Sequence, residues 1–362
     1  MKAHQIVPSL TPGDAISNHI LEIDGRLQKW GYDASIYAQY PAPALKNYVK
    51  PYSVLQERLD APDDLFIYHY GIYHHSVNYF RAARGKRLFI YHNITPAAFF
   101  AGWDKTNERL CRLGRMALGN LSACDLAAGV SDFNRRELVA AGFAEDKTGV
   151  LPIFLTLDQF ESLPPDSRLE KELRRPGQVN WLVVGRVVPN KNIEETIRLF
   201  YVYNRYLNPD SRLHIVGSDS MARYKQALLA LAEELGVQKR VHFTGRVSPA
   251  QFKTYYECAD LYVTASRHEG FCVPLLESMY FNVPILAREA AAIPETLGDA
   301  GILFTELGYA EAAQMAHMMI SDTAVRQQII AKQRERLQFF APDRVETILQ
   351  DMLRRLGLPD GR

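Results

Sequence analysis

The sequence predicts an α/β protein of two doubly wound domains. At 362 residues the chain exceeds a comfortable single hydrophobic core, so two domains are expected. Short apolar runs alternate with amphipathic stretches along both halves, which is typical of parallel sheets wound by helices. The stretch 161–177 interrupts this alternation with two prolines, mixed charge and a final Pro-Gly pair. We therefore expect a first domain at 1–160, a linker at 161–177, a second domain at 178–340 and a closing helical segment at 341–362.

The composition excludes several classes of protein. The 42 basic and 41 acidic residues give a formal net charge of +1, which argues against a nucleic-acid binder with a strong positive field. The four cysteines show no C-x-x-C spacing, so neither a zinc site nor a disulfide framework is indicated. We expect no metal and no cofactor. Neither a signal peptide nor a membrane-spanning run is recognised, so a soluble, cytoplasmic protein is expected.

The first domain opens with a strand at His4–Leu10, a turn at Gly13 and a helix at Ala15–Trp30. A strand, a glycine turn and a helix in this order begin a doubly wound sheet. Gly13 alone is a weak signal, because it can simply permit the turn. Residues at the turn can face an acceptor, or they can cap the helix and be solvated. These residues are Asp14, Asn18 and His19.

Further strands are expected at Ala34–Ala38 and Leu65–His69, followed by an aromatic and histidine-rich patch at Tyr68–His75. Three histidines within this patch raise the possibility of a metal site. However, two of them are adjacent and no acidic residue has ligand spacing, so we favour a wall for an acceptor or sugar over a metal site, and local packing over either. The candidates here are His69 and Tyr70.

The next strand, Arg87–His92, places His92 at its carboxyl end, where open α/β sheets bind ligands. The segment 96–121 is aromatic and then basic, and it contains an amphipathic helix with Arg109, Arg112 and Arg115. Such a helix can lie on an anionic membrane, or it can pack on the core with a solvated basic face. The domain closes with a strand, a capped helix and a strand, at Leu126–Val130, Phe133–Ala141 and Val150–Leu155.

The second domain opens with a buried strand at Val179–Val184, followed by Gly185-Arg186 and, after a loop, by Lys191 and a helix from Ile193. Two cations at one strand end can clamp a diphosphate, because arginine offers a bidentate fork and lysine a point charge. The remaining expected elements are a strand at Arg212–Gly217, a helix at Met221–Leu235, a strand at Val241–Gly245, a helix at Pro249–Cys258, strands at Leu261–Ala265, Pro284–Ala287 and Ile302–Thr305, and a final helix at Asp343–Leu356.

The most informative stretch is Arg267–Met279, which follows the apolar strand at Leu261–Ala265. A glycine breaks the chain and a proline stands where a first helical turn tolerates it, so we expect a strand, a turn and a helix start. Such a helix start directs backbone N–H groups at an anion. Two carboxylates, Glu269 and Glu277, frame the site and can accept hydrogen bonds from sugar hydroxyls. The alternative is a capped helix with two solvated acids.

This stretch resembles the E-x7-E motif of retaining GT-B glycosyltransferases of family GT4. Glu269 and Glu277 match the two acids, and Arg186 with Lys191 matches the family's G-R-x-x-x-x-K segment. His92 resembles the histidine that the family places near the donor sugar. The resemblance covers nearly the whole chain and is strongest from Val183 to Glu295, where it includes the F-x-G segment before Arg246-Val247 and the triplet Ile293-Pro294-Glu295.

The resemblance implies a GT-B fold, with the active site in the cleft between the domains and a last helix that returns to the first domain. In the family the first acid contacts the donor sugar, the second holds the ribose, and the loop between them contacts the diphosphate. The catalytic candidates are Glu269, His92, Arg186 and Lys191. The donor-binding candidates are Gly13, Arg186, Lys191, Val247, Glu269, Gly270, Phe271, Cys272, Val273 and Glu277. The family's glycine-rich loop is reduced here to the single Gly13, and Cys272 stands where a small residue is common.

The implied activity is retaining transfer of a hexose, with mannose favoured, from a nucleoside diphosphate sugar to a saccharide or lipid-linked saccharide. No D-x-D triplet occurs in the chain, so we expect the cations, and not a divalent metal, to stabilise the leaving group. A sugar phosphorylase, an epimerase and a noncatalytic nucleotide-binding scaffold remain as alternatives. Peripheral association with an anionic membrane is a further possibility, and no nucleic-acid partner is expected.

Overall fold

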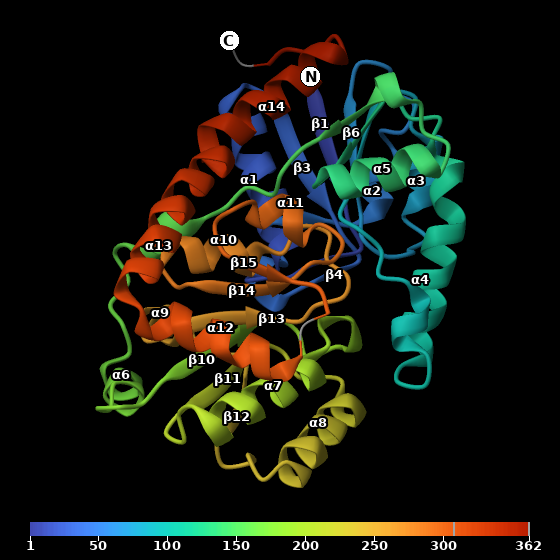
Figure 1. The fold of residues 1–362 in the computed structure, drawn as a ribbon. Coiled ribbons are helices and arrows are strands. Elements are labelled where there is room, and N and C mark those ends of the chain that lie inside the picture. Colours follow the sequence, from blue (N-terminus) through green and yellow to red (C-terminus); the bar gives the residue numbers. More distant parts are fainter. Residues whose placement is uncertain (307, 361–362) are drawn as a thin grey trace. The chain divides into compact units, whose positions relative to one another are not determined.

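The computed structural model describes residues 1–306 and 308–360, and the chain divides into two compact units. Unit 1 comprises Met1–Ala98, Lys105–Thr156 and the chain from Phe340 onwards. Unit 2 comprises Phe99–Asp104 and Leu157–Phe339. Each unit is built on its own parallel sheet, which confirms the predicted fold class (Figure 1).

Within the described residues, unit 1 contains a seven-stranded parallel sheet and a separate two-stranded pair. In spatial order the sheet consists of β5 (Val49–Lys50), β3 (Asp33–Tyr37), β1 (Lys2–Ile6), β6 (Leu65–Tyr70), β7 (Lys86–Tyr91), β8 (Leu126–Gly129) and β9 (Thr148–Val150). The small pair is β2 (Ser9–Leu10) with β4 (Tyr40–Pro41). The helices of unit 1 are α1 (Ala15–Lys29), α2 (Tyr52–Gln56), α3 (Val77–Ala82), α4 (Lys105–Leu118), α5 (Asp132–Ala140) and α14 (Pro342–Arg355).

The core of unit 1 lies on both faces of its sheet. All six residues of β6 are buried, as expected of a central parallel strand covered on both sides. The Tyr70 side chain is completely buried, and its hydroxyl donates to the carbonyl of Gly114 on α4 at 2.8 Å. A Cβ at Gly114 would lie 2.7 Å from Ile94 Cδ1, so the glycine allows α4 to approach this closely. Tyr70 is thus a core residue, in line with the local packing that we favoured for this patch, and this corrects its place among the acceptor candidates.

Two predicted strands of unit 1 are shorter in the structure. The first prediction, His4–Leu10, is divided between β1 and β2, and Pro8 lies between them. The last, Val150–Leu155, keeps only its first residue within β9, and Pro152 follows two residues later. Both differences have the same cause: proline has no N–H group to donate to a ladder, so pairing stops near it.

The chain from Phe340 rejoins unit 1 through α14. Its buried face consists of Val345, Leu349, Met352 and Leu353. Glu346 forms an ion pair with Arg26 of α1 at 3.2 Å, and Figure 1 shows α14, in red, beside the blue elements from the opposite end of the chain. The amphipathic spacing recognised in the sequence is therefore used to pack the last helix against the first unit.

Unit 2 contains, within the described residues, a six-stranded parallel sheet flanked by helices. Its spatial order is β12 (Val241–Gly245), β11 (Arg212–Val216), β10 (Asn180–Val184), β13 (Leu261–Thr264), β14 (Ile285–Arg288) and β15 (Ile302–Phe304). Its helices are α6 (Ser167–Leu173), α7 (Ile193–Tyr206), α8 (Ala222–Glu234), α9 (Pro249–Glu257), α10 (Val273–Tyr280), α11 (Ile293–Leu297), α12 (Tyr309–Ser321) and α13 (Thr323–Leu337).

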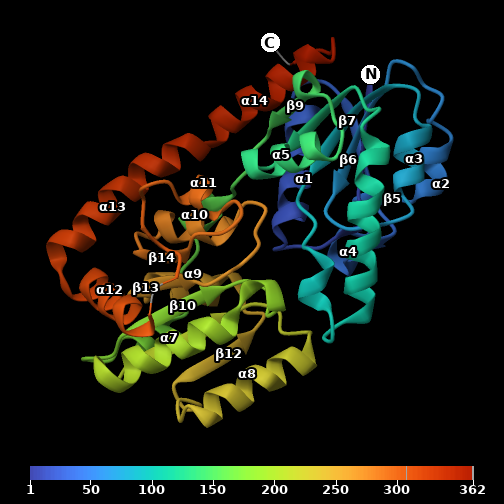
Figure 2. The ribbon, with the colours of Figure 1, turned by 45° about the vertical axis from the view of Figure 1, so that its right-hand side comes forward.

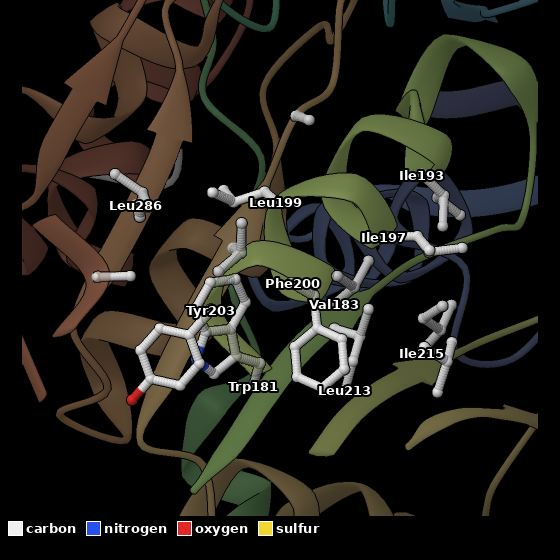
Figure 3. Close-up of a cluster of buried hydrophobic side chains, with 14 of the residues drawn as sticks. Trp181, Val183, Ile193, Ile197, Leu199, Phe200, Tyr203, Leu213, Ile215 and Leu286 are labelled. Carbon is white, nitrogen blue, oxygen red and sulfur yellow. The ribbon is translucent and has the colours of Figure 1, made fainter. Parts of the chain in front are cut away.

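Helices α7, α8 and α12 cover one face of this sheet. Alternate strand residues such as Trp181 and Val183 point towards α7, where they meet Phe200 and Tyr203 (Figure 3). The Trp181 and Tyr203 rings are 4.8 Å apart. Figure 2 shows α7 and α8 side by side along this layer. This tightly packed layer gives the carboxyl ends of β10 and β13 a rigid base.

The range 161–177, which we expected to be a linker, contains α6 and belongs to unit 2. Asp166 caps α6 by accepting hydrogen bonds from two backbone N–H groups of its first turn. Lys253 of α9 donates to the carbonyls of Phe160 and Leu163, at 2.8 and 2.7 Å, and so anchors the preceding chain. The boundary between the units falls instead at Thr156–Leu157.

Among the described residues, no helix has both the length and the apolar character needed to cross a membrane.

Candidate functional site

The candidate site of unit 2 lies at the carboxyl ends of β10 and β13. These two neighbouring strands mark the point where the strand order reverses, and open α/β sheets bind ligands outside such a point. The segments after the two strands carry the predicted cations and the first predicted acid. The fold therefore brings together residues that lie far apart in the sequence.

Three glycines end the adjacent strands β10, β11 and β12. Gly185, Gly217 and Gly245 all have positive φ, at 138°, 142° and 68°. The Gly217 N–H donates to the Gly245 carbonyl at 3.0 Å, and a Cβ at Gly217 would lie only 2.1 Å from the Gly185 carbonyl oxygen. Glycine is therefore required at position 217, where the loop after β11 lies directly against the loop after β10. At Gly185, the missing side chain also leaves room for Lys191, whose Nζ would lie 3.3 Å from a Cβ there.

Lys191 and Glu269 form a largely buried ion pair at the centre of the site. Lys191 Nζ lies 2.6 Å from Glu269 Oε1, and the two side chains are 16% and 11% exposed. Burial alone would lower the pKa of Lys191, but the attraction of Glu269 outweighs it and the pKa is raised. Arg186, whose side chain is exposed, opposes this effect by its like charge. The structure thus joins two predicted residues to each other and places a second cation within their electrostatic reach.

Ser266 and Asn190 support this pair, and the sequence analysis missed both. Ser266 Oγ lies 2.6 Å from Glu269 Oε1 and 3.1 Å from the Asn190 carbonyl oxygen, either of which can accept its proton. The Asn190 amide donates to the carbonyl of His268 at 3.0 Å. These bonds tie the segment after β10 to the segment after β13. The only indication of these roles in the sequence is that Asn190 directly precedes Lys191 and Ser266 directly precedes the stretch Arg267–Met279.

The helix start predicted after Gly270 is present as α10, with Cys272 as its N-cap and Pro274 in its first turn. Cys272 has a φ of 69°, a left-handed conformation that costs a side chain-bearing residue about 1 kcal/mol. Glycine would adopt it without that cost, which explains why a small residue suits this position. The Cys272 side chain is buried, and burial raises the pKa of its thiol. A buried thiol of this kind is a packing group and a poor nucleophile.

Glu277 projects from α10, and Tyr256 of α9 donates to its Oε2 at 2.7 Å. Burial raises the pKa of Glu277 to about 7, although the hydrogen bond from Tyr256 and the charge of Lys191 both act to lower it. Tyr256 is completely buried and its ring stacks on Phe281, with centroids 5.1 Å apart. The second acid of the motif is therefore rigidly held and close to its titration point at neutral pH. Tyr256 is another supporting residue that the sequence analysis did not identify.

Val247, one of the donor-binding candidates, lines a pocket of about 340 Å³ in unit 2. The pocket is also lined by residues of α6, α9, β11 and β12, among them Arg212, His214, His242, Arg246, Gln251 and Tyr255. Its wall is mostly polar, with rings and guanidinium groups that can contact a planar ligand.

Phe99–Asp104, part of the aromatic segment 96–121, belong to unit 2 and pack within it. The Arg267 guanidinium lies 5.6 Å from the centre of the Phe99 ring, and the Trp103 and Tyr224 rings meet edge to face at 5.2 Å. The carbonyl of Gly102 accepts a hydrogen bond from Arg223 at 2.9 Å. Phe99 and Trp103 therefore have packing roles next to the site loop and on α8, respectively.

In unit 1, the predicted residues fall into two groups. At the first turn, Gly13 has a φ of 76°, and Asp14 caps α1 by accepting from the Ser17 N–H at 3.1 Å, while Asn18 is partly exposed on α1. At the ends of β6 and β7, His69 and His92 are buried and hydrogen-bonded to each other at 3.0 Å.

Among the described residues, no group of three or more histidine, cysteine, aspartate or glutamate side chains is arranged to hold a metal ion.

Comparisons with curated proteins identify relatives of low sequence identity. The chain is 22% identical over 236 residues to O-antigen chain mannosyltransferase B of Escherichia coli, a match that covers 64% of this chain and 60% of the relative. It is 28% identical over 210 residues to the GDP-mannose-dependent alpha-(1-6)-phosphatidylinositol monomannoside mannosyltransferase of Mycolicibacterium smegmatis, which covers 55% and 52%. The matched regions thus span less than two thirds of these curated relatives.

Solved structures show the same fold over the whole length. HepE of Anabaena, in complex with UDP and glucose, superimposes with a TM-score of 0.76 at 18% identity, covering 98% of this chain and 99% of HepE. WaaG, a glycosyltransferase involved in lipopolysaccharide biosynthesis, gives a TM-score of 0.74 at 15% identity, covering 98% and 100%. Residues 167–336 match the family model for glycosyl transferases group 1. These comparisons confirm the resemblance to glycosyl transferases of group 1, which extends over residues 167–336, and they show that the chain has the GT-B fold.

Proposed function

We propose that the protein is a retaining glycosyltransferase of the GT4 type, which transfers a hexose from a nucleoside diphosphate sugar to a saccharide acceptor. The observation that carries this proposal is the Lys191–Glu269 pair at the switch point of unit 2, with Glu277 on the following helix. A cation suits a diphosphate, and acids suit sugar hydroxyls. A nucleotide sugar is a ligand that presents both groups.

In the proposed mechanism, Arg186, Lys191 and the N–H groups at the start of α10 bind the diphosphate. When the anomeric C–O bond breaks, its electron pair passes to the diphosphate, and these groups stabilise the charge that develops. The acceptor hydroxyl attacks the anomeric carbon from the face of the leaving group and passes its proton to a leaving phosphate oxygen. We infer that these cations take the place of a divalent metal, in keeping with a chain that has no D-x-D triplet.

The remaining residues have positioning roles in this proposal. Glu269 orients the donor sugar, and Glu277 accepts hydrogen bonds from the ribose hydroxyls. The thiol of Cys272, which burial keeps protonated, does not take part in covalent chemistry. We propose that His92 serves the same reaction from unit 1 by binding a sugar hydroxyl. Val247 and the polar pocket beside it are proposed to receive the base.

We propose GDP-mannose as the donor. The support is that two of the relatives described above are named as mannosyltransferases, one of them GDP-mannose-dependent, whereas HepE was crystallised with UDP and glucose. The first test is to measure the melting temperature with GDP, UDP, ADP or no nucleotide. At about a hundred times its Kd, a ligand adds roughly 2.7 kcal/mol of stability, so binding is visible.

The expected result is stabilisation by GDP that is lost in Lys191→Ala. Stabilisation by UDP instead would keep the transferase and change the donor. A protein that responds to no nucleotide would contradict the proposed function. For the reaction itself, transfer of radiolabelled mannose to a saccharide mixture should be lost in Arg186→Ala. Release of free mannose 1-phosphate that depends on added phosphate would indicate a phosphorylase instead.

We further propose that the protein is cytoplasmic and that α4 contacts an anionic membrane carrying a lipid-linked acceptor. The structure narrows the cations available for this contact, because Arg115 donates to the Ile94 carbonyl and to Glu137. Arg109 and Arg112 are exposed, although Arg112 also donates to Glu108 at 2.6 Å, and Met116 is 73% exposed on the same helix. Sedimentation with vesicles rich in phosphatidylglycerol should weaken in Arg109→Gln/Arg112→Gln, and equal binding by wild type and variant would contradict the contact.

A further inference from the structure

A chain of buried polar side chains in unit 1 leads from α1 to His92. Gln5 lies on β1, His69 on β6 and His92 directly after β7, so the chain crosses three neighbouring strands. Gln5 Oε1 lies 3.0 Å from His69 Nε2, and His69 Nδ1 lies 3.0 Å from His92 Nε2. All three side chains are less than a tenth exposed. Buried hydrogen bonds of this kind must each have one donor and one acceptor, so the direction of every bond can be worked out.

The orientation of the Gln5 amide is fixed at its other end. Gln5 Nε2 lies 3.2 Å from the carbonyl oxygen of Ile20 and 3.3 Å from Asp24 Oδ1. A backbone carbonyl can only accept, so the nitrogen of the amide must face it whatever the charge of Asp24. Asp24 is itself held by Gln28 and Tyr48, which both donate to its Oδ2. Gln5 therefore presents its oxygen, an obligate acceptor, to His69.

This orientation sets the proton positions in both histidines. His69 must carry its proton on Nε2 in order to donate to Gln5, and its Nδ1 is then the acceptor. His92 must in turn carry its proton on Nε2 in order to donate to His69. Burial lowers the pKa of His69 well below its usual value and lowers that of His92 to about 3, so both rings are neutral near neutral pH. A neutral His92 with its proton on Nε2 has an unprotonated Nδ1.

The Nδ1 atom of His92 is buried and has no hydrogen-bond partner in the part of the chain that the structure describes. Within the same part of the chain, the neighbouring His19 has an unpaired donor instead of an unpaired acceptor. Its Nδ1 accepts from the Phe154 N–H at 2.9 Å, so its proton is on Nε2, and this donor also has no partner among the described residues. The two rings lie 5.6 Å apart, nearly perpendicular. An unused acceptor close to an unused donor suits a hydroxyl group, which can both donate and accept.

We propose that Gln5 and His69 are positioning residues that hold His92 in its Nε2-protonated tautomer, so that Nδ1 accepts a hydrogen bond from a hydroxyl of the bound sugar. The identity of that hydroxyl rests on the proposed function, whereas the tautomer rests on the hydrogen-bond chain alone. In the reverse tautomer, His92 would present a donor at Nδ1, and a hydroxyl bound there would have to turn its proton elsewhere.

The test is a long-range ¹H–¹⁵N spectrum of the histidine rings in the full chain, with His92 assigned by substitution. In the wild type, the spectrum should show His92 protonated on Nε2. In His69→Leu, His92 loses its acceptor and should change its ring pattern, and kcat/KM with the nucleotide sugar should fall about tenfold, the effect of roughly one hydrogen bond. In His69→Gln, the amide can accept from His92 and donate to Gln5, so both readouts should return towards the wild type.

His4→Gln is the matched control. His4 is also a buried histidine of β1 and is adjacent to Gln5, but its ring bonds to Tyr37 and Asp64 and takes no part in the chain. This variant should leave the His92 pattern unchanged. If His69→Leu does not fold, Gln5→Leu removes the acceptor at the start of the chain and should allow both tautomers of His92.

The proposal is overturned if wild-type His92 is protonated on Nδ1, or if its pattern is the same in wild type and His69→Leu. If His92 has the predicted tautomer but the protein binds no nucleotide, the positioning role of Gln5 and His69 stands and the proposed function is wrong. An altered tautomer without any change in kcat/KM would show that the chain is structural.

Discussion

Lys191 Nζ lies 2.6 Å from Glu269 Oε1, so the cation proposed to bind the diphosphate is paired with the acid proposed to bind the sugar. Ser266 Oγ shares the same carboxylate oxygen at 2.6 Å. An incoming diphosphate must therefore compete with Glu269 for Lys191, or share it. The pair therefore couples diphosphate binding to sugar binding, because a diphosphate that draws Lys191 away leaves the carboxylate of Glu269 without its counter-charge.

This coupling predicts opposite effects of Glu269→Gln on binding and on catalysis. Removing the carboxylate charge releases Lys191, so a nucleoside diphosphate without sugar should bind about fivefold more tightly, the effect of roughly 1 kcal/mol. The sugar loses an orienting group, so kcat should fall about a hundredfold. Isothermal titration with GDP or UDP and a transfer assay measure the two effects.

Glu257→Gln is the matched control for that experiment. Glu257 also forms an ion pair with a lysine in unit 2, Lys253 at 3.6 Å, but it lies on α9 and outside the candidate site. It should change neither nucleotide affinity nor kcat. Weaker binding of the diphosphate by Glu269→Gln would contradict the idea that Glu269 competes for Lys191.

The raised pKa of Glu277 predicts that donor binding depends on pH. A carboxylate accepts hydrogen bonds from ribose hydroxyls better than the neutral acid does, and the pKa of about 7 means that Glu277 ionises between pH 6 and 8. The affinity for a nucleotide sugar should therefore rise over this range and level off above it. A nucleotide sugar is the better probe than GDP, because its diphosphate has no proton to lose near neutral pH. In Glu277→Gln the dependence should be absent.

The same group predicts a change of stability with pH. The pKa in the folded state lies above the unfolded value of about 4.3, so the folded protein binds more protons between the two. The free energy of unfolding should therefore fall as the pH rises from about 4.5 through 7, relative to Glu277→Gln. Melting temperatures of both proteins at several pH values measure this difference. A difference that grows in the opposite direction would show that Glu277 is ionised in the folded protein well below pH 7.

The positions of Lys191, Glu269 and Glu277 at strand ends and on α10 could be predicted because periodicity and turn residues report on local structure. Apolar runs marked β10 and β13, and a glycine followed by a proline marked the start of α10. Parallel strands bring their carboxyl ends to one edge, so two distant motifs could be expected to meet there.

The supporting residues could not be predicted, because their roles depend on tertiary contacts. Tyr256 has the same helical spacing as any core residue of α9, and only the fold places its hydroxyl on Glu277. Gln5 lies in the buried strand β1, where nothing local shows that it faces His69 across the sheet. Tyr70 illustrates the reverse error, since a polar group in an aromatic patch suggested a ligand wall, whereas its hydroxyl is satisfied by Gly114 in the core.

Tyr256→Phe should raise the midpoint of the pH dependence of donor binding. The hydrogen bond from Tyr256 stabilises the ionised form of Glu277, so its loss should raise the pKa of that acid above its present value of about 7. Nucleotide-sugar affinity at pH 7 should fall and should recover at higher pH. An unchanged midpoint would show that the hydrogen bond does not control the ionisation. Phe281→Leu, which alters the ring stacked on Tyr256 and keeps the hydroxyl, is the matched control for packing.

The glycines at the strand ends predict a sharp difference between two alanine substitutions. In Gly217→Ala, the new Cβ would lie 2.1 Å from the Gly185 carbonyl oxygen, so the loops after β10 and β11 must separate. This should cost more than about 3 kcal/mol of stability and disturb Arg186 and Lys191. Gly236→Ala also has a positive φ, of 72°, but open space around it, so it should cost only about 1 kcal/mol and leave nucleotide binding unchanged. Urea denaturation of both variants measures the free energy of unfolding that each substitution costs. Equal losses would mean that backbone conformation, and not the close approach of the loops, makes glycine necessary at position 217.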